Sequence, residues 1–189
     1  RAVAMALDTS RFKNGLKVEL SGSPFVMIYF QHVKPGKGGA FVRTKLKNLL
    51  TGKVIDRTFR SGEKVEEADI EERAMQYLYL DGDNLVFMDN KTYDQVPMSQ
   101  GVVGDVRLLL KENTDVSVLF WRGNPVNVDL PSFIDVVVSQ CDPGFRGDTA
   151  SNGTKPATVE TGATVQVPLF IKEGETIRID TRTGEYSER

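Results

Sequence analysis

Cysteine and histidine are almost absent from this chain of 189 residues, which has one of each. The single cysteine, Cys141, cannot form a disulfide within the chain, which is typical of proteins from a reducing compartment. Together with His32 it makes neither a cluster of metal ligands nor a thiol–imidazole catalytic pair. We therefore expect no metal site and no cofactor, a cytoplasmic location, and a structural role for Cys141 as a small buried residue.

Long apolar runs are also absent. No stretch approaches the roughly 20 apolar residues needed to cross a bilayer, and we expect no signal peptide because the N-terminal region has no continuous apolar core. The composition, 40% hydrophobic and 26% charged, is that of an ordinary folded protein. We expect no membrane partner, and the length allows one domain or several small ones.

Acidic residues are missing from one region of the chain. Residues 20–55 contain six basic residues and no acidic one, whereas residues 56–105 contain twelve acidic and five basic residues. A phosphate backbone attracts the first region and repels the second, so we expect a nucleic-acid surface in the N-terminal part only. The six basic residues are Lys34, Lys37, Arg43, Lys45, Lys47 and Lys53.

A glycine-rich turn lies in the middle of this basic region. Pro35 stiffens its approach, and Gly36, Gly38 and Gly39 allow backbone angles that are closed to other residues. Such a turn holds Lys37 away from the body of the protein, where its ammonium group can reach a partner. The alternative is an ordinary hairpin with a solvated lysine, since turns of this composition are mostly structural.

Short strand-like segments separated by turns fill most of the chain. Residues 40–47 alternate with period two. One face carries Phe41, Arg43, Lys45 and Lys47, and the other carries Val42, Thr44 and Leu46. We expect the basic face to point outward, in line with the glycine-rich turn. Five or six such segments within about the first 65 residues predict a small barrel.

The rest of the chain continues the strand pattern. A hairpin, a short helix at residues 102–110 and a further pair of strands suit an oligonucleotide-binding (OB) barrel, and the segments after residue 133 suit another barrel. We expect Trp121 to pack in or near a core, because no basic cluster accompanies it. The predicted strands are residues 74–80, 85–88, 116–121, 126–130, 134–138, 159–167, 169–171 and 176–180.

Four motifs follow one another along the chain: residues 34–38 with the run 40–52, residues 142–149, residues 155–174 and residues 179–186. In this order they resemble bacterial elongation factor P. Together they cover nearly the whole length from Phe12, and the combination is far more specific than any single motif. A paralogous family lacks the lysine at the loop tip, and the eukaryotic and archaeal counterpart lacks the third domain, so Lys37 and the C-terminal motifs argue against both.

The resemblance implies an all-β chain of three small barrels arranged in an L shape similar to a tRNA. The first is an SH3-like barrel of the KOW type at residues 1–67, and OB folds follow at residues 68–131 and 132–189. The strand pattern indicates barrels independently, whereas the number of domains and the L shape come from the resemblance alone. We also expect a monomer.

The resemblance further implies a role on the ribosome. Members of the family enter between the peptidyl and exit tRNA sites when peptide-bond formation stalls, typically at consecutive prolines. Their first domain lies along the acceptor stem of the peptidyl-site tRNA, and its loop tip reaches the peptidyl-transferase centre. In many members the tip lysine carries an added β-lysine, so Lys37 matches a modified residue, and a lysine-modifying enzyme is an implied partner. The supporting loop residues are Lys34, Pro35, Gly36, Gly38 and Gly39.

The same resemblance, together with the charge pattern, implies further contacts with RNA. Arg43, Lys45 and Lys47 are expected to contact tRNA or rRNA phosphates, which set affinity and register rather than sequence preference. The third domain is implied to lie near the small subunit, with a loop that faces the exit-site codon of the mRNA. That loop matches Gly147, Asp148 and Thr149.

Two other classes of function compete with this one. An enzyme would show a concave pocket with titratable groups of perturbed pKa, but no nucleophile pairing, metal-ligand spacing or phosphate-binding glycine loop is visible in the sequence. A generic RNA-binding barrel protein acting off the ribosome would stack bases on aromatic residues. Its candidates, Tyr77, Tyr79 and Trp121, lie in or beside the acidic middle of the chain.

Overall fold

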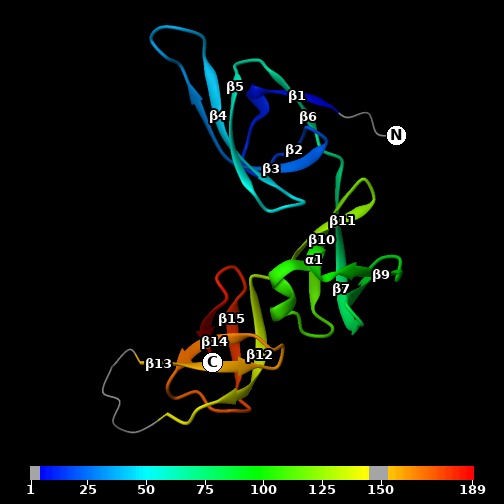
Figure 1. Cartoon of the computed structure of the whole chain (residues 1–189), viewed down its shortest axis with the longest axis vertical. Coiled ribbons are helices and arrows are strands. Elements are labelled where there is room, and N and C mark those ends of the chain that lie inside the picture. Colours follow the sequence, from blue (N-terminus) through cyan, green and yellow to red (C-terminus); the bar gives the residue numbers. More distant parts are fainter. Residues whose placement is uncertain (1–4, 145–152) are drawn as a thin grey trace. The chain divides into compact units, whose positions relative to one another are not determined.

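The structure is a computed structural model that describes residues 5–144 and 153–189 (Figure 1). Its strands form three sheets, one of six strands and two of five. The chain divides into two compact units, residues 1–72 with 119–127, and residues 73–118 with 128–189. The predicted all-β class, with several curled sheets, is confirmed. In the described part of the chain, no helix is long and apolar enough to cross a membrane.

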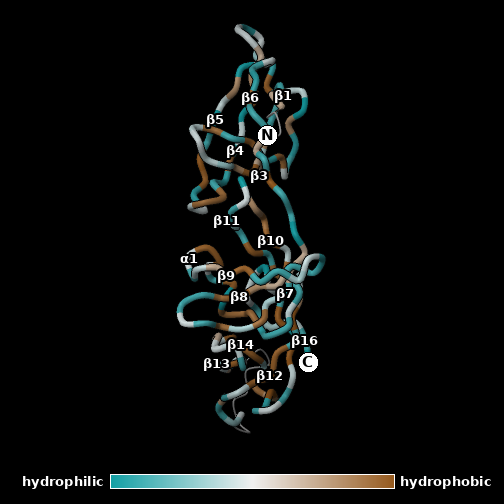
Figure 2. The backbone as a smooth tube through the Cα atoms, turned by 90° about the vertical axis from the view of Figure 1, so that its right-hand side faces the viewer, coloured by the Kyte–Doolittle hydropathy of each residue, from teal (hydrophilic) through white to brown (hydrophobic). Residues whose placement is uncertain are grey.

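The sheet of the first unit has the strand order β1-β6-β2-β3-β4-β5. Strands of alternating character wrap one apolar core, in which Val18, Val42 and Leu46 have no exposed area. Figure 2 shows the same alternation as short hydrophilic and hydrophobic stretches along the backbone. The elements are β1 (Ala6–Asp8), the 3-10 turn η1 (Thr9–Arg11), β2 (Lys17–Leu20), β3 (Ser23–Val33), β4 (Phe41–Asn48), β5 (Val54–Arg60) and β6 (Lys64–Glu67).

The β3–β4 hairpin positions the glycine-rich loop. Its antiparallel pairing begins with Phe25 opposite Asn48 and continues to Val33 opposite Phe41, directly beside the loop. The register shifts once, between Met27 and Tyr29, where β3 has one residue more than β4. The loop is therefore the end of a continuous two-stranded ladder.

The central sheet has the order β11-β10-β7-β8-β9. The helix predicted at residues 102–110 is only partly present, because α1 ends at Val103, Gly104 follows with a φ of 70°, and a 3-10 turn replaces the rest. Residues 119–127 of its last hairpin belong to the first unit. The elements are β7 (Ile70–Asp81), β8 (Asn84–Asp89), β9 (Gln95–Ser99), α1 (Gln100–Val103), η2 (Gly104–Leu109), β10 (Asp115–Trp121) and β11 (Asn124–Asp129).

The C-terminal sheet has the order β14-β13-β12-β15-β16 and encloses a valine- and isoleucine-rich core. The single strand predicted at residues 159–167 is wrong, because a turn with Gly162 at φ 91° separates two strands there. The strand predicted at residues 169–171 is also wrong, since Ile171 N–H donates to Pro168 in a turn. The elements are β12 (Phe133–Cys141), β13 (Thr154–Val159), β14 (Thr164–Pro168), β15 (Thr176–Asp180) and β16 (Glu185–Glu188).

Candidate nucleic-acid interface

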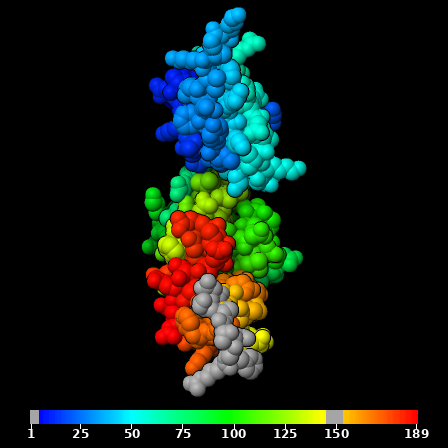
Figure 3. All heavy atoms as spheres, turned by 90° about the vertical axis from the view of Figure 1, so that its left-hand side faces the viewer, coloured from blue at the N-terminus to red at the C-terminus, as the bar shows by residue number. Residues whose placement is uncertain are grey.

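Lys37 lies in the loop between β3 and β4, and all residues from Lys34 to Gly39 are exposed. Gly38 has a φ of 99°, a backbone conformation that side chains other than glycine rarely adopt. A Cβ atom built on Gly36, Gly38 or Gly39 would meet no atom within 4 Å, so the loop backbone stands in open space. The space-filling view shows this blue loop projecting from the body of the first unit (Figure 3).

The three cations of β4 form an outward row next to the loop. Arg43, Lys45 and Lys47 are exposed, while the residues between them, Thr44 and Leu46, are at most 2% exposed. The outward basic face predicted from the period of the sequence is therefore confirmed. The strand fixes this direction because its apolar side chains fill the core.

The neighbouring strands supply the rest of this outward face. Residues directly opposite one another in a ladder point to the same face. Tyr29 of β3 and Asp56 of β5 both lie opposite Lys45, one on each side. Neither residue could be assigned to this face from the sequence, because cross-strand neighbours follow from the register. Asp56 is also the first residue after the acid-free region.

The cations of the loop and the row are not neutralised within the first unit. In residues 5–144 and 153–189, no carboxylate forms an ion pair with Lys37, Arg43, Lys45 or Lys47. The guanidinium carbon (Cζ) of Arg43 instead lies 5.5 Å from the centroid of the Phe41 ring. Four positive charges therefore remain available to an anionic partner, and the arrangement suits the backbone of a nucleic acid.

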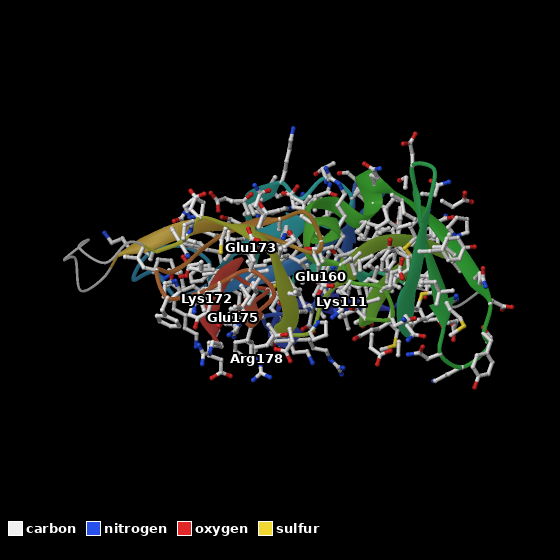
Figure 4. The ribbon with its side chains drawn as sticks, turned by 90° about the horizontal axis from the view of Figure 1, so that it is seen from below. Lys111, Glu160, Lys172, Glu173, Glu175 and Arg178 are labelled. Atoms are coloured by element: carbon white, nitrogen blue, oxygen red, sulfur yellow. The ribbon has the colours of Figure 1, made fainter. Side chains whose placement is uncertain are left out.

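The second unit contains a hollow of about 630 Å³ that tests the enzyme alternative. Its lining includes two basic and two acidic residues. The Nζ atom of Lys111 lies 3.1 Å from Oε1 of Glu160, and Figure 4 labels these two residues side by side. Burial, and then the charge of Glu112, raise the pKa of Tyr77, which keeps this phenol protonated and unsuited to act as a base. The lining offers a balanced, internally paired surface and no activated nucleophile.

Carboxylates of lowered pKa lie in structural turns and ion pairs. The backbone N–H groups of Lys91 and Thr92 donate to Asp89 at 2.7 and 3.1 Å and lower the pKa of its carboxyl group. The hydrogen bond from Arg178 lowers the pKa of Asp135. Among the described residues, no group of three or more His, Cys, Asp or Glu side chains could hold a metal ion.

The remaining candidates from the sequence are scattered. Gly147, Asp148 and Thr149 lie outside the described residues. Tyr77 is 7% exposed, and the Arg122 guanidinium lies 4.7 Å from the half-buried Trp121 ring while it pairs with Glu19. These two aromatic residues are therefore poorly placed to stack on bases, which weakens the generic RNA-binding alternative.

Cys141 is not fully buried as expected. It is half-buried against the core of the C-terminal sheet, and its thiol donates to the carbonyl oxygen of Ile171 at 3.6 Å. The thiol thus has a structural contact.

Known solved structures share the architecture of part of the chain. Eukaryotic translation initiation factor 5A from Methanococcus jannaschii superposes with a TM-score of 0.54 and 24% sequence identity, covering 65% of this chain and 90% of that one. At this identity the comparison supports the fold alone.

Family models and curated relatives match nearly the whole chain. The family model of the elongation factor P (EF-P) KOW-like domain matches residues 8–65, that of the EF-P OB domain matches residues 70–128, and that of the elongation factor P C-terminal domain matches residues 134–189. Elongation factor P of Thermoanaerobacter sp. (strain X514) is 56% identical over 94% of this chain and 96% of its own length. Elongation factor P of Desulfitobacterium hafniense (strain DSM 10664 / DCB-2) is 53% identical over 97% of this chain and 99% of its own length. The chain therefore belongs to the elongation factor P family.

Proposed function

We propose that this translation elongation factor binds the ribosome between the peptidyl and exit tRNA sites and stimulates peptide-bond formation at stalled runs of proline. One observation carries the proposal: Lys37 is exposed in a glycine-built loop at the end of the β3–β4 hairpin, and the outward cations of β4 continue from it. Family membership supports the role in translation.

The loop acts by positioning. A long cation at its tip reaches the CCA end of the peptidyl-site tRNA and binds its backbone, which holds the reacting ester in place. Proline is a poor nucleophile in a rigid ring, so alignment is where assistance is available, and alignment can contribute several kcal/mol to a barrier. A β-lysyl group, added to Lys37 by a modifying enzyme, would lengthen the reach of the cation.

The outward row supplies affinity. Arg43 and Lys47 are four residues apart on β4, which corresponds to about 13 Å along a strand. Three cations at this spacing follow a phosphate backbone, and we assign them to the acceptor stem of the tRNA and to adjacent rRNA. These contacts fix the register of the protein on the RNA and are insensitive to base sequence.

The remaining assignments rest on the motifs. We propose three domains, at residues 1–67, 68–131 and 132–189, whose boundaries fall between β6 and β7 and between β11 and β12. We assign Gly147, Asp148 and Thr149 to the exit-site codon and the third domain to the small subunit. The protein acts in this account as a cytoplasmic monomer.

Synthesis of a peptide with three consecutive prolines in a purified translation system tests the proposal. The arms are no factor, the protein, Lys37→Ala, and Lys91→Ala as a matched exposed lysine. We expect the protein and Lys91→Ala to raise the yield, and Lys37→Ala to lower it at least about tenfold, corresponding to about 1.4 kcal/mol of barrier. The free energy of unfolding of Lys37→Ala should change by no more than about 0.5 kcal/mol.

A negative result is informative only if the protein used is folded and carries its modification. If folded protein, with its modification verified by mass, gives no increase in the triple-proline product, the proposed function is wrong. Equal activity of the protein and Lys37→Ala would reject the role of the loop tip.

A further inference from the structure

We infer that Tyr29 makes the outward face of the first sheet a stacking site for an unpaired RNA nucleotide, next to the phosphate-binding row. The inference rests on the proposed function for the use of this face. It adds a contact of a different kind, with a base rather than with the backbone. The site consists of Tyr29 and Gln31 on β3 and Arg43 and Lys45 on β4.

The bulge in β3 places the tyrosine on this face. Met27 lies opposite Leu46 and points into the core, so simple alternation would turn Ile28 outward and Tyr29 inward. The register shift adds one residue to β3, and Tyr29 rather than Ile28 lies opposite Lys45. Bulges are a common means of redirecting a side chain at a functional surface.

The aromatic ring is exposed and held in place. Tyr29 is 43% exposed, and its hydroxyl group donates to Gln31 Oε1 at 3.1 Å. Gln31 in turn lies opposite Arg43. The hydrogen bond restrains the ring along β3, which reduces the entropy lost when a base stacks on it.

Charge around the ring favours a nucleotide over a neutral aromatic ligand. Residues opposite one another in an antiparallel ladder have Cβ atoms about 5 Å apart, so the Tyr29 ring and the Lys45 ammonium can engage the base and the phosphate of one nucleotide. Asp56 lies on the other side of Lys45 and repels phosphate there. The favourable path for the phosphate therefore lies on the β3 side, beside the tyrosine.

The nucleotide must be unpaired. In a duplex the bases are stacked on one another, and aromatic side chains reach them only in single strands, loops and ends. The row of cations can bind the phosphates of a duplex, whereas Tyr29 can stack only on a base of a single strand. The two together fit a junction between a duplex and a single-stranded 3′ tail.

A second tyrosine provides a matched control. Tyr79 on β7 is 45% exposed, and its hydroxyl group donates to Gln95 Oε1 at 3.5 Å. Tyr79 lies in the acidic middle of the chain, without a row of cations. It therefore reproduces the exposure and the hydrogen bond of Tyr29 but not its charge environment.

Binding of two RNA hairpins tests the inference. One has a four-nucleotide 3′ tail with 2-aminopurine at each tail position in turn, and the other is blunt. We expect the protein to bind the tailed RNA about 5- to 150-fold more tightly, which is the effect of one stacked base. We also expect the fluorescence of one tail position to be quenched on binding.

The variants separate stacking from charge. Tyr29→Ala should lose both the preference for the tail and the quenching, while Tyr79→Ala should keep both. Tyr29→Phe keeps the ring but loses the hydrogen bond to Gln31, so it should keep the quenching with a smaller preference for the tail. Replacing Arg43, Lys45 and Lys47 by Gln should weaken binding of both RNAs, which tests the proposed phosphate row separately. A wild-type protein without preference for the tail, or a Tyr29→Ala variant of unchanged Tm that keeps the preference and the quenching, would overturn the inference.

Discussion

At the scale of single residues, the backbone rather than side-chain contacts presents Lys37. The loop glycines have open space around them, so their value lies in conformation, most clearly at Gly38 with its φ of 99°. A side chain at this position would be strained even though nothing obstructs it. A substitution of Lys37 should therefore leave the conformation of the loop unchanged, whereas a substitution of Gly38 should alter it.

Asp89 is a residue whose charge should stabilise the fold in a pH-dependent manner. Hydrogen bonds from the Lys91 and Thr92 N–H groups lower the pKa of its carboxyl group below the ordinary value of 3.8. The stabilisation is fully present above that value and is lost as the pH falls through the lower pKa of the folded state. We expect the difference in Tm between the protein and Asp89→Asn to be positive at pH 7 and to shrink as the pH falls below 3.8.

Thermal unfolding between pH 7 and pH 2 measures this difference. Asp83→Asn, in the exposed turn between β7 and β8, makes the same chemical change and serves as the control. A difference for Asp89→Asn that stayed constant over the whole range would show that its carboxyl group is not preferentially ionised in the folded state.

At the scale of the element, β4 contributes side chains both to the core and to the proposed RNA-binding row. Its inward residues fill the core, and its outward residues form the row of cations. The two sets can be changed independently, because successive side chains of a strand point to opposite faces.

The salt dependence of RNA binding tests the row. Each phosphate contact adds about 0.7 to 0.9 to the slope of log K against log salt concentration. Replacing Arg43, Lys45 and Lys47 by Gln should therefore lower the slope by about 2 to 3 for a tailed RNA hairpin, as measured by titration between about 50 and 200 mM salt.

A charge-matched variant makes this experiment specific. Lys13, Lys91 and Lys172 are exposed and lie outside the row, so replacing all three by Gln changes the net charge equally. If both triple variants lower the slope by the same amount, the binding reflects overall charge, and the row has no special role.

The elements that were predictable from the sequence are those with a clear period and clear turns. β4 alternates along its whole length, and glycines and a proline mark the loop before it, so its face and its loop were both predicted. The turn after Val159 was missed because Thr164, Val165 and Val167 continue a strand-like pattern beyond it. Residues 169–171 were assigned to a strand because they are apolar, yet Ile171 is buried in a turn.

The residues of the candidate site that were missed depend on register. Tyr29 lies in an apolar run in which nothing local marks a bulge, so its outward direction follows only from pairing with β4. Asp56 approaches Lys45 across a ladder, eleven positions away in sequence. The sequence pattern within a regular strand predicts the face to which each side chain points. The side chains beside it on neighbouring strands depend on how the strands pair in the folded protein.

At the scale of the whole molecule, the charge of the chain is unevenly distributed although its net value is only −2. The basic region folds into the hairpin and loop of the first unit, and the acidic region begins within that unit at Asp56 and continues into the central sheet. The proposed RNA contacts therefore fall in one part of the protein, and this asymmetry would favour binding in a single orientation.

The central claim is that the tip of the loop reaches the CCA end of the peptidyl-site tRNA. Directed hydroxyl-radical cleavage tests it most directly, because the chain has one cysteine and Cys141→Ser provides a background without thiols. An iron chelate attached through Lys37→Cys, on ribosomes with peptidyl-tRNA, should cleave the single-stranded 3′ end of that tRNA, and a chelate attached through Lys91→Cys should not. Ribosome-bound protein that leaves the 3′ end intact from position 37 would contradict the account.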